Sequence, residues 1–303
     1  MTAPSKPVLR VLTGCTAVGK TELALAWAEK NGAEIISCDS LLFYRGMDIG
    51  TAKPSRAELS RVPHHLIDTN ELRDQMDIGR YVQAALTCAQ EIQARGNRVL
   101  VTGGSGFYLK AFFHAVVDDV EVAPPLRERI RALSATEALA ELRALNPDGL
   151  GALDTANPRR VTRALERCLS SGRTLGELTW EFQAKRPPFA DWDTRLLRVE
   201  RDSAELEARL ATRVRQMLGA GLVEEVRRLD ALGLRDNPSA ARAIGYREVL
   251  DYFDGKLPEA ELEARIVADT RALVRKQRTW FRSQVPPHAC LDPRTSPESP
   301  WPW

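Results

Sequence analysis

The chain has 303 residues, of which 44% are hydrophobic and 28% charged, and its 43 Lys and Arg residues nearly balance 41 Asp and Glu residues. This composition excludes disordered and fibrous proteins and leaves enough chain to bury a large core. No apolar run approaches the about 20 residues of a membrane span, and no secretion-signal pattern opens the sequence. The five cysteines form no C-x-x-C motif. We therefore expect a cytoplasmic protein without a membrane partner, a disulfide framework or a cysteine-based zinc site.

Two stretches are strongly basic although the formal net charge is only +2. Residues 265–282 carry six basic residues against one acidic residue, and residues 157–173 carry five arginines against one glutamate. A localised surface that binds a polyanion leaves such a pattern. Charge alone fits a solvated helix face at least as well.

The first predicted elements alternate between strands and helices. Residues 8–13 are predicted to form a strand that ends at a glycine loop, and residues 22–30 the helix that follows. Two further strands are expected at residues 34–37 and 98–102, with an amphipathic helix at 78–92 between them. This alternation is typical of a parallel sheet covered on both faces.

The strand signal largely disappears after residue 119. Residues 286–303 carry six prolines and are predicted to be a disordered tail. Helices are predicted for 124–145, 157–170, 203–218, 222–232, 239–253 and 258–282.

The glycine loop after the first strand carries the clearest motif. Residues 14–21 read GCTAVGKT and match G-x-x-x-x-G-K-[ST], between a predicted strand and a predicted helix as the motif requires. In such a loop the backbone N–H groups converge on a phosphate, the lysine adds a mobile charge and the last hydroxyl can ligate Mg²⁺. We expect the phosphate-binding residues to be Gly14, Cys15, Thr16, Ala17, Val18, Gly19, Lys20 and Thr21, with Thr21 as the metal ligand. Cys15 is expected to be accessible to thiol reagents.

The loop alone does not identify the reaction. No convincing strand ends in the aspartate that a hydrolase uses to hold Mg²⁺. Asp39 instead follows the strand at 34–37, and the carboxyl ends of parallel strands face one crevice. A carboxylate there can deprotonate the acceptor of a group transfer. It can equally cap a helix or lie beside a Mg²⁺ ion, so its role stays open on these residues alone.

The segment around Asp39 resembles a long family signature. Residues 38–54 read CDSLLFYRGMDIGTAKP, which is similar to D-S-x-x-x-Y-[RK]-x-[ML]-D-I-G-T-A-K-P of the tRNA dimethylallyltransferases, also called tRNA isopentenyltransferases. The resemblance extends over residues 8–282, and departs from the family pattern at 153–160. Further stretches that agree in order are residues 63–68, 103–108, 160–166, 221–226, 243–248 and 270–281.

The resemblance implies transfer of a dimethylallyl group from dimethylallyl diphosphate to N6 of the adenosine 3′ to the anticodon of tRNA, with Mg²⁺ as cofactor and the anticodon stem-loop as partner of a monomer. It implies that Asp39 is the general base and that Thr16 and Arg209 contact the leaving diphosphate. The implied tRNA contacts are Asp39, Ser40, Leu41, Leu42, Ser105, Arg127, Arg159, Arg160, Val161, Thr162, Arg163, Arg271, Arg275, Lys276 and Gln277. Tyr44 and Phe107 are candidates to stack on the flipped base, although burial is the more common fate of an aromatic side chain.

Together these patterns predict an α/β fold with a P-loop parallel-sheet core covered by helices, and the resemblance implies a mainly helical insertion domain. The expected division is the first part of the core at 1–119, the insertion domain at 120–156, a mainly helical remainder of the core at 157–285 and the tail at 286–303.

Three other functions stay open. A P-loop small-molecule kinase would place ATP on the same loop and require it as donor. An RNA-binding module with a decayed site would bind tRNA without turnover, but the intact Lys20 and Asp39 argue against decay. An enzyme that prenylates free adenine nucleotides would not need the two basic stretches.

Overall fold

The structure is a computed structural model that describes residues 5–294 and residue 301. It divides into two compact units. Unit 1 comprises Met1–His114 and Pro188–Trp303, and unit 2 comprises Ala115–Pro187. Each unit is described by itself.

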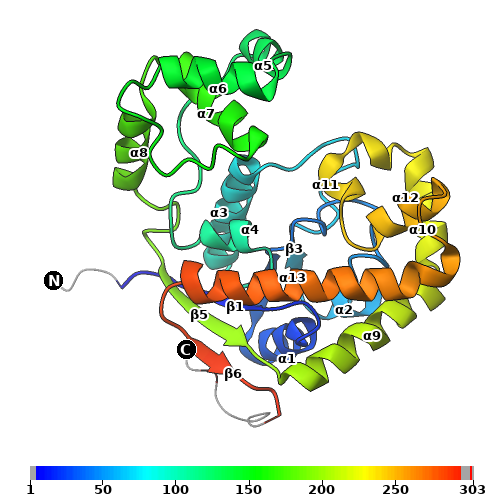
Figure 1. Ribbon diagram of the computed structural model, residues 1–303. Coiled ribbons are helices and arrows are strands. Elements are labelled where there is room, and N and C mark those ends of the chain that lie inside the picture. Colours follow the sequence, from blue (N-terminus) through cyan, green and yellow to red (C-terminus); the bar gives the residue numbers. More distant parts are fainter. Residues whose placement is uncertain (1–4, 295–300, 302–303) are drawn as a thin grey trace. The chain divides into compact units, whose positions relative to one another are not determined.

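Unit 1 is built on a six-stranded sheet with the strand order β3-β2-β4-β1-β5-β6 (Figure 1). All five pairings are parallel. Helices cover the sheet, and every residue of β2 is buried, as expected for a parallel sheet covered on both faces. The strands are β1 (Val8–Gly14), β2 (Ala33–Ser37), β3 (His64–His65), β4 (Arg98–Gly103), β5 (Asp193–Val199) and β6 (Ala289–Leu291). The predicted α/β fold with a parallel-sheet core is confirmed.

Three of these strands, the two-residue β3 as well as β5 and β6, lie where the sequence predicted none. β5 has the sequence DTRLLRV, and its polar residues hide the apolar alternation of a strand. It pairs with β1 along seven residues, so its tertiary neighbour supplies the stabilisation that its composition does not. β6 pairs with β5 and falls within the tail that was predicted to be disordered. The prediction of disorder is therefore wrong for residues 289–291. Residues 295–300 and 302–303 of that tail lie outside the described residues.

The helices of unit 1 form two groups. Near the sheet lie α1 (Lys20–Asn31), α3 (Ile78–Ala94), the short α4 (Gly106–Lys110) and the long α13 (Leu262–Gln284), which packs against α9 (Ser203–Gly219). A second apolar core gathers the remaining helices around Val226, Leu234 and Tyr246. These are α10 (Leu222–Ala231), α11 (Pro238–Ala241) and α12 (Tyr246–Phe253), with 3₁₀ turns at Leu234–Asp236 and Glu259–Glu261.

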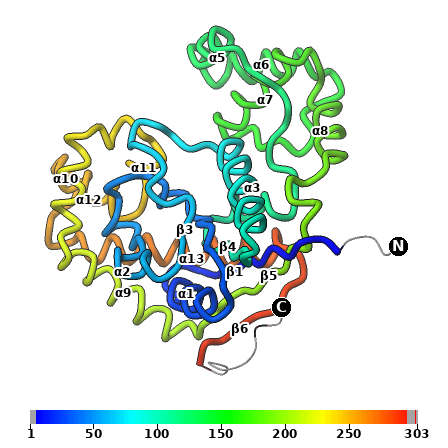
Figure 2. The backbone as a smooth tube through the Cα atoms, turned by 180° about the vertical axis from the view of Figure 1, so that it is seen from behind, coloured from blue at the N-terminus to red at the C-terminus, as the bar shows by residue number. Residues whose placement is uncertain are grey.

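The segment that follows β3 connects the sheet to this second core. Figure 2 shows, from behind, how it passes α11 before it enters α3. Asn237 Nδ2 donates a hydrogen bond of 2.7 Å to the carbonyl oxygen of Leu72 on that segment. Before it, α2 (Arg56–Arg61) begins with a capping box at Ser55.

Unit 2 is helical, as predicted, but it extends beyond the expected boundary at residue 156. Its helices are α5 (Pro124–Arg131), α6 (Ala135–Ala144), α7 (Pro158–Ser171) and α8 (Leu175–Ala184). Helix α7 packs against the other three. Val161, Leu165 and Leu178 are buried in the core that results, so residues 157–187 belong to this unit and not to the sheet-bearing core.

Among residues 5–294 and 301, no helix combines the length and the apolar character needed to cross a membrane.

Candidate active site

The phosphate loop lies between β1 and α1, where the motif requires it. Gly14 leaves β1 so close to β5 that a Cβ atom would lie 2.5 Å from the carbonyl oxygen of Val199. Gly19 has φ +95°, a conformation that favours glycine. The backbone conformation of the loop therefore requires both glycines, whether or not a ligand binds.

Lys20 extends from the start of α1 back over the loop. Its Nζ donates to the carbonyl oxygens of Gly14 at 3.0 Å and Cys15 at 2.8 Å. Burial lowers the pKa of Lys20 to about 8, and the nearby Asp39 carboxylate partly opposes that shift. The lysine is thus a cation held in surroundings that disfavour its charge, and an anion bound beside it would relieve this penalty.

Asp39 lies two residues after β2, on the same edge of the sheet as the phosphate loop. Its Oδ1 accepts a hydrogen bond of 3.0 Å from the backbone N–H of Leu41. Burial raises the pKa of the Asp39 carboxyl, while that hydrogen bond, Lys20 and Arg213 lower it. A raised pKa makes this carboxylate a stronger proton acceptor than an exposed aspartate, while the two nearby cations favour its ionised form.

Arg213 is a residue of this site that sequence reasoning did not single out. It projects from α9, lines a cavity with Lys20 and Asp39, and donates from Nη2 to the carbonyl oxygen of Thr51 at 3.3 Å. Arg209, the residue expected at the diphosphate, lies one helical turn earlier and donates from Nε to the carbonyl oxygen of Ala17 at 2.8 Å. Both arginines reach the loop region from one helix, and no sequence signal separates them.

Three cavities meet at Thr16 and Asp39, since both residues line all three. The smallest, of about 100 Å³, lies between the phosphate loop, Thr51 and Arg213. The second, of about 390 Å³, opens toward α9 and α11. The third, of about 520 Å³, runs between α4 and α13. Asp39 thus stands where a group bound on the phosphate loop and a group bound in a larger cavity can meet.

The third cavity has aromatic walls. Phe107 is 56% exposed and lines it together with Tyr108 and Trp280. A Cβ atom on Gly106 would lie 2.7 Å from the Trp280 ring, so this glycine allows helix α4 to approach the indole closely. Phe107 therefore remains a stacking candidate, whereas Tyr44 is buried and does not line the cavity.

Helix α13 closes over the phosphate loop through Gln277. Its Oε1 accepts a hydrogen bond of 3.0 Å from the backbone N–H of Thr16, and its Nε2 donates to the carbonyl oxygen of Gly104 at 3.1 Å. Ser105, in the same glycine turn after β4, accepts a hydrogen bond of 3.0 Å from the backbone N–H of Ser40. These contacts join the loops that follow β1, β2 and β4 into one site.

The family-like segment after Asp39 is held in place by a buried carboxylate. Glu225 accepts hydrogen bonds from three successive backbone N–H groups, those of Asp48 at 3.0 Å, Ile49 at 2.8 Å and Gly50 at 3.1 Å. The hydroxyl of Tyr246 donates to the same carboxylate at 2.7 Å. Consecutive N–H groups around an anion form a rigid nest, which here sets the course of the chain into Thr51.

Close packing and charge complete this arrangement. A Cβ atom on Gly50 would lie 2.4 Å from the Tyr246 ring, so only glycine fits. The side chain of Lys53 is 4% exposed and forms ion pairs of 2.7 Å with Asp48 and 2.5 Å with Asp68. The residues of this segment thus hold the backbone that carries Thr51 to Arg213.

The residues present fit a Mg²⁺ ion next to a bound diphosphate. Thr21 and Asp39 supply oxygen atoms to the smallest cavity, as oxygen-ligated Mg²⁺ requires. Ser37 lines the same cavity, and its buried Oγ has no hydrogen-bond partner among the described residues. A polar ligand in the cavity would satisfy that hydroxyl.

The other expected tRNA contacts occupy varied positions. Leu41 and Leu42 border the cavities at Asp39, Lys276 lines the aromatic cavity, and Arg271 is exposed and ion-paired with Glu207. Arg275 lines a separate cavity of about 560 Å³, with the arginines Arg198, Arg201, Arg278 and Arg282. That cavity also contains the Cys15 side chain, which is only 7% exposed, so its expected accessibility to thiol reagents is wrong.

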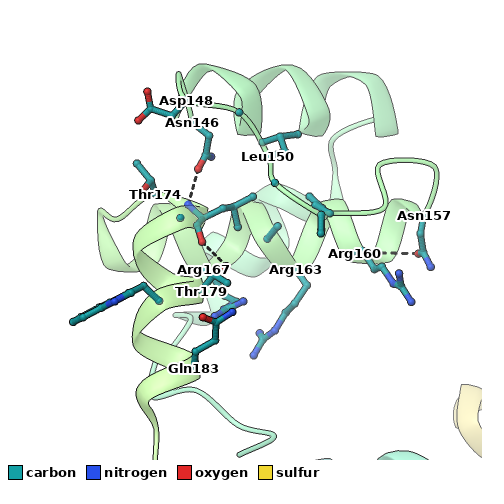
Figure 3. Close-up of a pocket in the computed structure, with 18 of the residues that line it drawn as sticks. Asn146, Asp148, Leu150, Asn157, Arg160, Arg163, Arg167, Thr174, Thr179 and Gln183 are labelled. Atoms are coloured by element: carbon teal, nitrogen blue, oxygen red, sulfur yellow. Dashed lines mark hydrogen bonds between the residues drawn. The ribbon is translucent and has the colours of Figure 1, made fainter. Parts of the chain in front are cut away.

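Unit 2 carries the remaining expected contacts. Arg159, Arg160 and Arg163 line a cavity of about 830 Å³ (Figure 3). Val161 between them is buried in the core of the unit, so its side chain is not available for an RNA contact, contrary to expectation. Thr162 donates from Oγ1 to the carbonyl oxygen of Pro158 at 2.9 Å, and Arg127 lies on α5, outside that cavity.

The chain is similar to known proteins over most of its length. The family model described as IPP transferase matches residues 42–284. A tRNA dimethylallyltransferase of Opitutus terrae is 64% identical over 287 residues, which cover 95% of this chain and 94% of that relative. The full-length tRNA isopentenylpyrophosphate transferase of Bacillus halodurans has a similar structure, with a TM-score of 0.68 and 31% identity over 95% of this chain and 90% of its own. A eukaryotic dimethylallyltransferase acting on tRNA shares the fold, with a TM-score of 0.81 at 24% identity over 95% of this chain and 74% of its own.

Proposed function

The chain belongs to the IPP transferase family, and from this and the position of Asp39 we propose that it transfers a dimethylallyl group from dimethylallyl diphosphate to N6 of the adenosine 3′ to the anticodon of tRNA. The observation that carries the proposal is that Asp39 stands where the cavity of the phosphate loop meets a cavity with aromatic walls. A base and a diphosphate bound in these cavities would approach each other at its carboxylate.

The diphosphate of the donor would bind on the phosphate loop. Thr16, Ala17, Lys20 and Thr21 of the loop line the cavity in which it would lie, together with Arg213. Thr21 would hold Mg²⁺ there, and the ion would neutralise part of the diphosphate charge. Because charge on the leaving group grows as the carbon–oxygen bond breaks, these cations stabilise the transition state more than the ground state.

The acceptor adenine would enter the aromatic cavity. A base in an anticodon loop must leave its stack to reach an enclosed site, and side chains such as Phe107 and Trp280 can receive its flat face. As N6 forms its bond to the allylic carbon, the bond between that carbon and the diphosphate oxygen breaks and its electrons leave with diphosphate. Asp39 accepts the proton that N6 releases.

The experiment that tests this function supplies one donor at a time. The full chain is incubated with Mg²⁺ and an unmodified tRNA that has adenosine 3′ to its anticodon, with either dimethylallyl diphosphate or ATP, and the nucleosides are analysed by mass spectrometry. We expect N6-dimethylallyladenosine to form with the allylic donor alone. A parallel reaction with chelator in place of Mg²⁺ is expected to lose product.

The same assay separates the alternatives. Consumption of ATP with phosphorylation of a small acceptor, and no prenyl product, would identify a kinase. Tight tRNA binding without any transfer would identify an RNA-binding module. Prenylation of free adenosine monophosphate in preference to tRNA would identify a nucleotide-prenylating enzyme.

A further inference from the structure

Two arginines hold consecutive carbonyl groups of the phosphate loop. Nε of Arg201 donates a hydrogen bond of 2.7 Å to the carbonyl oxygen of Val18, and Nε of Arg209 donates one of 2.8 Å to that of Ala17. A Cβ atom on Gly19 would lie 3.3 Å from Nη2 of Arg201 and 3.7 Å from Nη2 of Arg209, so both guanidinium groups lie against this glycine. The middle of the loop is thus held by side chains from outside it.

The pairing of β5 with β1 brings Arg201 to the loop. In the parallel register of these strands, Val199 lies opposite Gly14, the first residue of the loop. Arg201 follows Val199 by two residues, in the turn before α9, and the side chain of Asp202 caps that helix. The backbone at Arg201 is therefore fixed by the sheet on one side and by a capped helix on the other.

The Arg201 side chain is also fixed at its far end. It is 11% exposed and forms an ion pair with Glu205, four residues later on α9. Oε2 of Glu205 lies 3.5 Å from Nε of Arg294, which follows β6. Because a largely buried ion pair is screened less than an exposed one, these contacts restrict the Arg201 side chain and keep its Nε at the Val18 carbonyl.

The direction of the two carbonyl groups sets the direction of the N–H groups in the same peptides. In a trans peptide the C=O and N–H bonds point to opposite sides. The N–H groups of Val18 and Gly19 therefore point away from the two arginines. Neither has a hydrogen-bond partner in the part of the chain that the structure describes. The residues on either side of them, Ala17 and Lys20, line the cavity with Asp39.

The loop does not adopt this conformation without support. Ala17 has φ +66°, in the left-handed region that is unfavourable for a residue with a Cβ atom. Such a conformation persists only where surrounding contacts impose it. The hydrogen bonds from Arg209 and Arg201 to the carbonyl groups of Ala17 and Val18 are contacts of this kind.

We propose that Arg201 is a positioning residue of the phosphate loop, which holds the Val18 carbonyl outward and thereby presents the Gly19 N–H group to the diphosphate of the donor. Arg201 lines none of the three cavities that meet at Asp39 and lines instead the separate cavity beside Cys15. It therefore acts through the loop and not by contact with the diphosphate. The proposal rests on the proposed function, because it takes a diphosphate as the ligand of the loop.

The test measures binding of inorganic diphosphate with Mg²⁺ to the full chain by titration calorimetry. Arg201→Met keeps the apolar part of the side chain and loses the donor, and we expect it to weaken binding by about 10-fold, the usual effect of losing one hydrogen bond from a charged group. Arg201→Lys, whose ammonium can still donate to Val18, is expected to recover part of the affinity. The matched control is Arg195→Met on β5, since Arg195 is exposed and pairs with Asp193.

A role in folding alone would act on every ligand alike. The affinity of each variant for an unmodified anticodon stem-loop and its unfolding midpoint are therefore measured as well, and we expect the stem-loop affinity of both Arg201 variants to match that of the wild type. Loss of both affinities in parallel with the unfolding midpoint would show that Arg201 only supports the fold, and would overturn the proposal.

A second measurement observes the loop itself and needs no variant. In the amide NMR spectrum of the isotope-labelled wild-type chain, added diphosphate is expected to move the Gly19 proton resonance downfield, because a charge-assisted hydrogen bond to an anion deshields the proton. The Gly32 N–H, which donates to Ala28 at the far end of α1, is expected not to move.

The outcomes separate this inference from the function on which it rests. An unmoved Gly19 resonance in the diphosphate-bound chain, or equal diphosphate affinity in the wild type and both Arg201 variants, would overturn the role of Arg201 and leave the proposed function standing. Absence of diphosphate binding in the wild-type chain would refute both.

Discussion

The Oε1 atom of Gln277 accepts a hydrogen bond of 3.0 Å from the backbone N–H of Thr16, so helix α13 is fastened to the phosphate loop across 261 residues of sequence. The same side chain donates from Nε2 to Gly104 at 3.1 Å. One amide therefore aligns the loops after β1 and β4.

Replacement of Gln277 by Leu is expected to loosen that alignment. The Thr16 N–H and the Gly104 carbonyl lose their partner, and because both are part-buried the cost per group lies below the about 1–3 kcal/mol of a fully buried one. We expect a lower unfolding midpoint in urea and a raised KM for dimethylallyl diphosphate. Gln284→Leu, at the exposed end of the same helix, is the control. Equal stability and equal KM in Gln277→Leu and Gln284→Leu would show that the hydrogen bonds of Gln277 have no role in holding the loop.

Replacement of Asp39 by Asn is expected to abolish transfer and to leave tRNA affinity nearly intact. The amide keeps the shape of the side chain but cannot accept the N6 proton, and loss of a general base typically lowers the rate by about 10²–10⁴-fold. Single-turnover rates and stem-loop affinity are measured together, with Asp251→Asn on the surface of α12 as the control. A variant that keeps most of its rate would exclude the base role.

Arg213 and Arg209 are expected to differ in importance although both lie on α9. Arg213 lines the cavity with Lys20 and Asp39, whereas Arg209 is not among the residues that line it. We expect Arg213→Gln to lower kcat/KM for the allylic donor by about 10-fold or more, as for loss of one charge-stabilising group, and Arg209→Gln to have the smaller effect. The two variants serve as each other's control. A larger loss of kcat/KM in Arg209→Gln than in Arg213→Gln would place the diphosphate on the Arg209 side of the loop.

Replacement of Glu225 by Gln is expected to destabilise the segment that begins at Asp48. The carboxylate accepts four hydrogen bonds, and an amide nitrogen in place of one oxygen would face donors. Two unpaired buried donors suggest a loss of about 2–5 kcal/mol in the free energy of unfolding. Denaturant unfolding measures it, with the exposed Glu224→Gln as control. A change below about 0.5 kcal/mol, the usual size for surface substitutions, would contradict this role.

The pH dependence of donor binding follows from Lys20. Its pKa in the protein is about 8, so the ammonium loses its proton as pH rises through that value and its attraction for diphosphate is lost. We expect kcat/KM for dimethylallyl diphosphate, which reports the free protein, to fall as pH rises above about 8. A bound diphosphate favours the charged lysine and raises its pKa, so kcat at saturating donor should fall only at higher pH. Identical profiles for the two constants would argue against titration of Lys20.

Several elements were predictable because their cause is local. β1, β2 and β4 are apolar runs next to glycine or polar loops, and α3 and α13 show helical periodicity over many residues. β5 was not predictable, because Arg195 and Arg198 interrupt its alternation and its pairing with β1 is a long-range contact. The same applies to β6, which forms only because β5 offers it an edge.

By itself the sequence determined the phosphate loop and the position of Asp39 after a strand, because glycine conformations and the order of strands in a parallel sheet are set by the local chain. Only the tertiary structure decided which of two arginines on α9 lines the cavity with Lys20 and Asp39, that Gln277 closes the loop, and that Glu225 supports the segment after Asp48. The reason is physical. These contacts join residues more than 160 positions apart in the sequence. Arg209 and Arg213 are chemically equivalent and lie one helical turn apart, so they differ only in the residues that the fold places beside them.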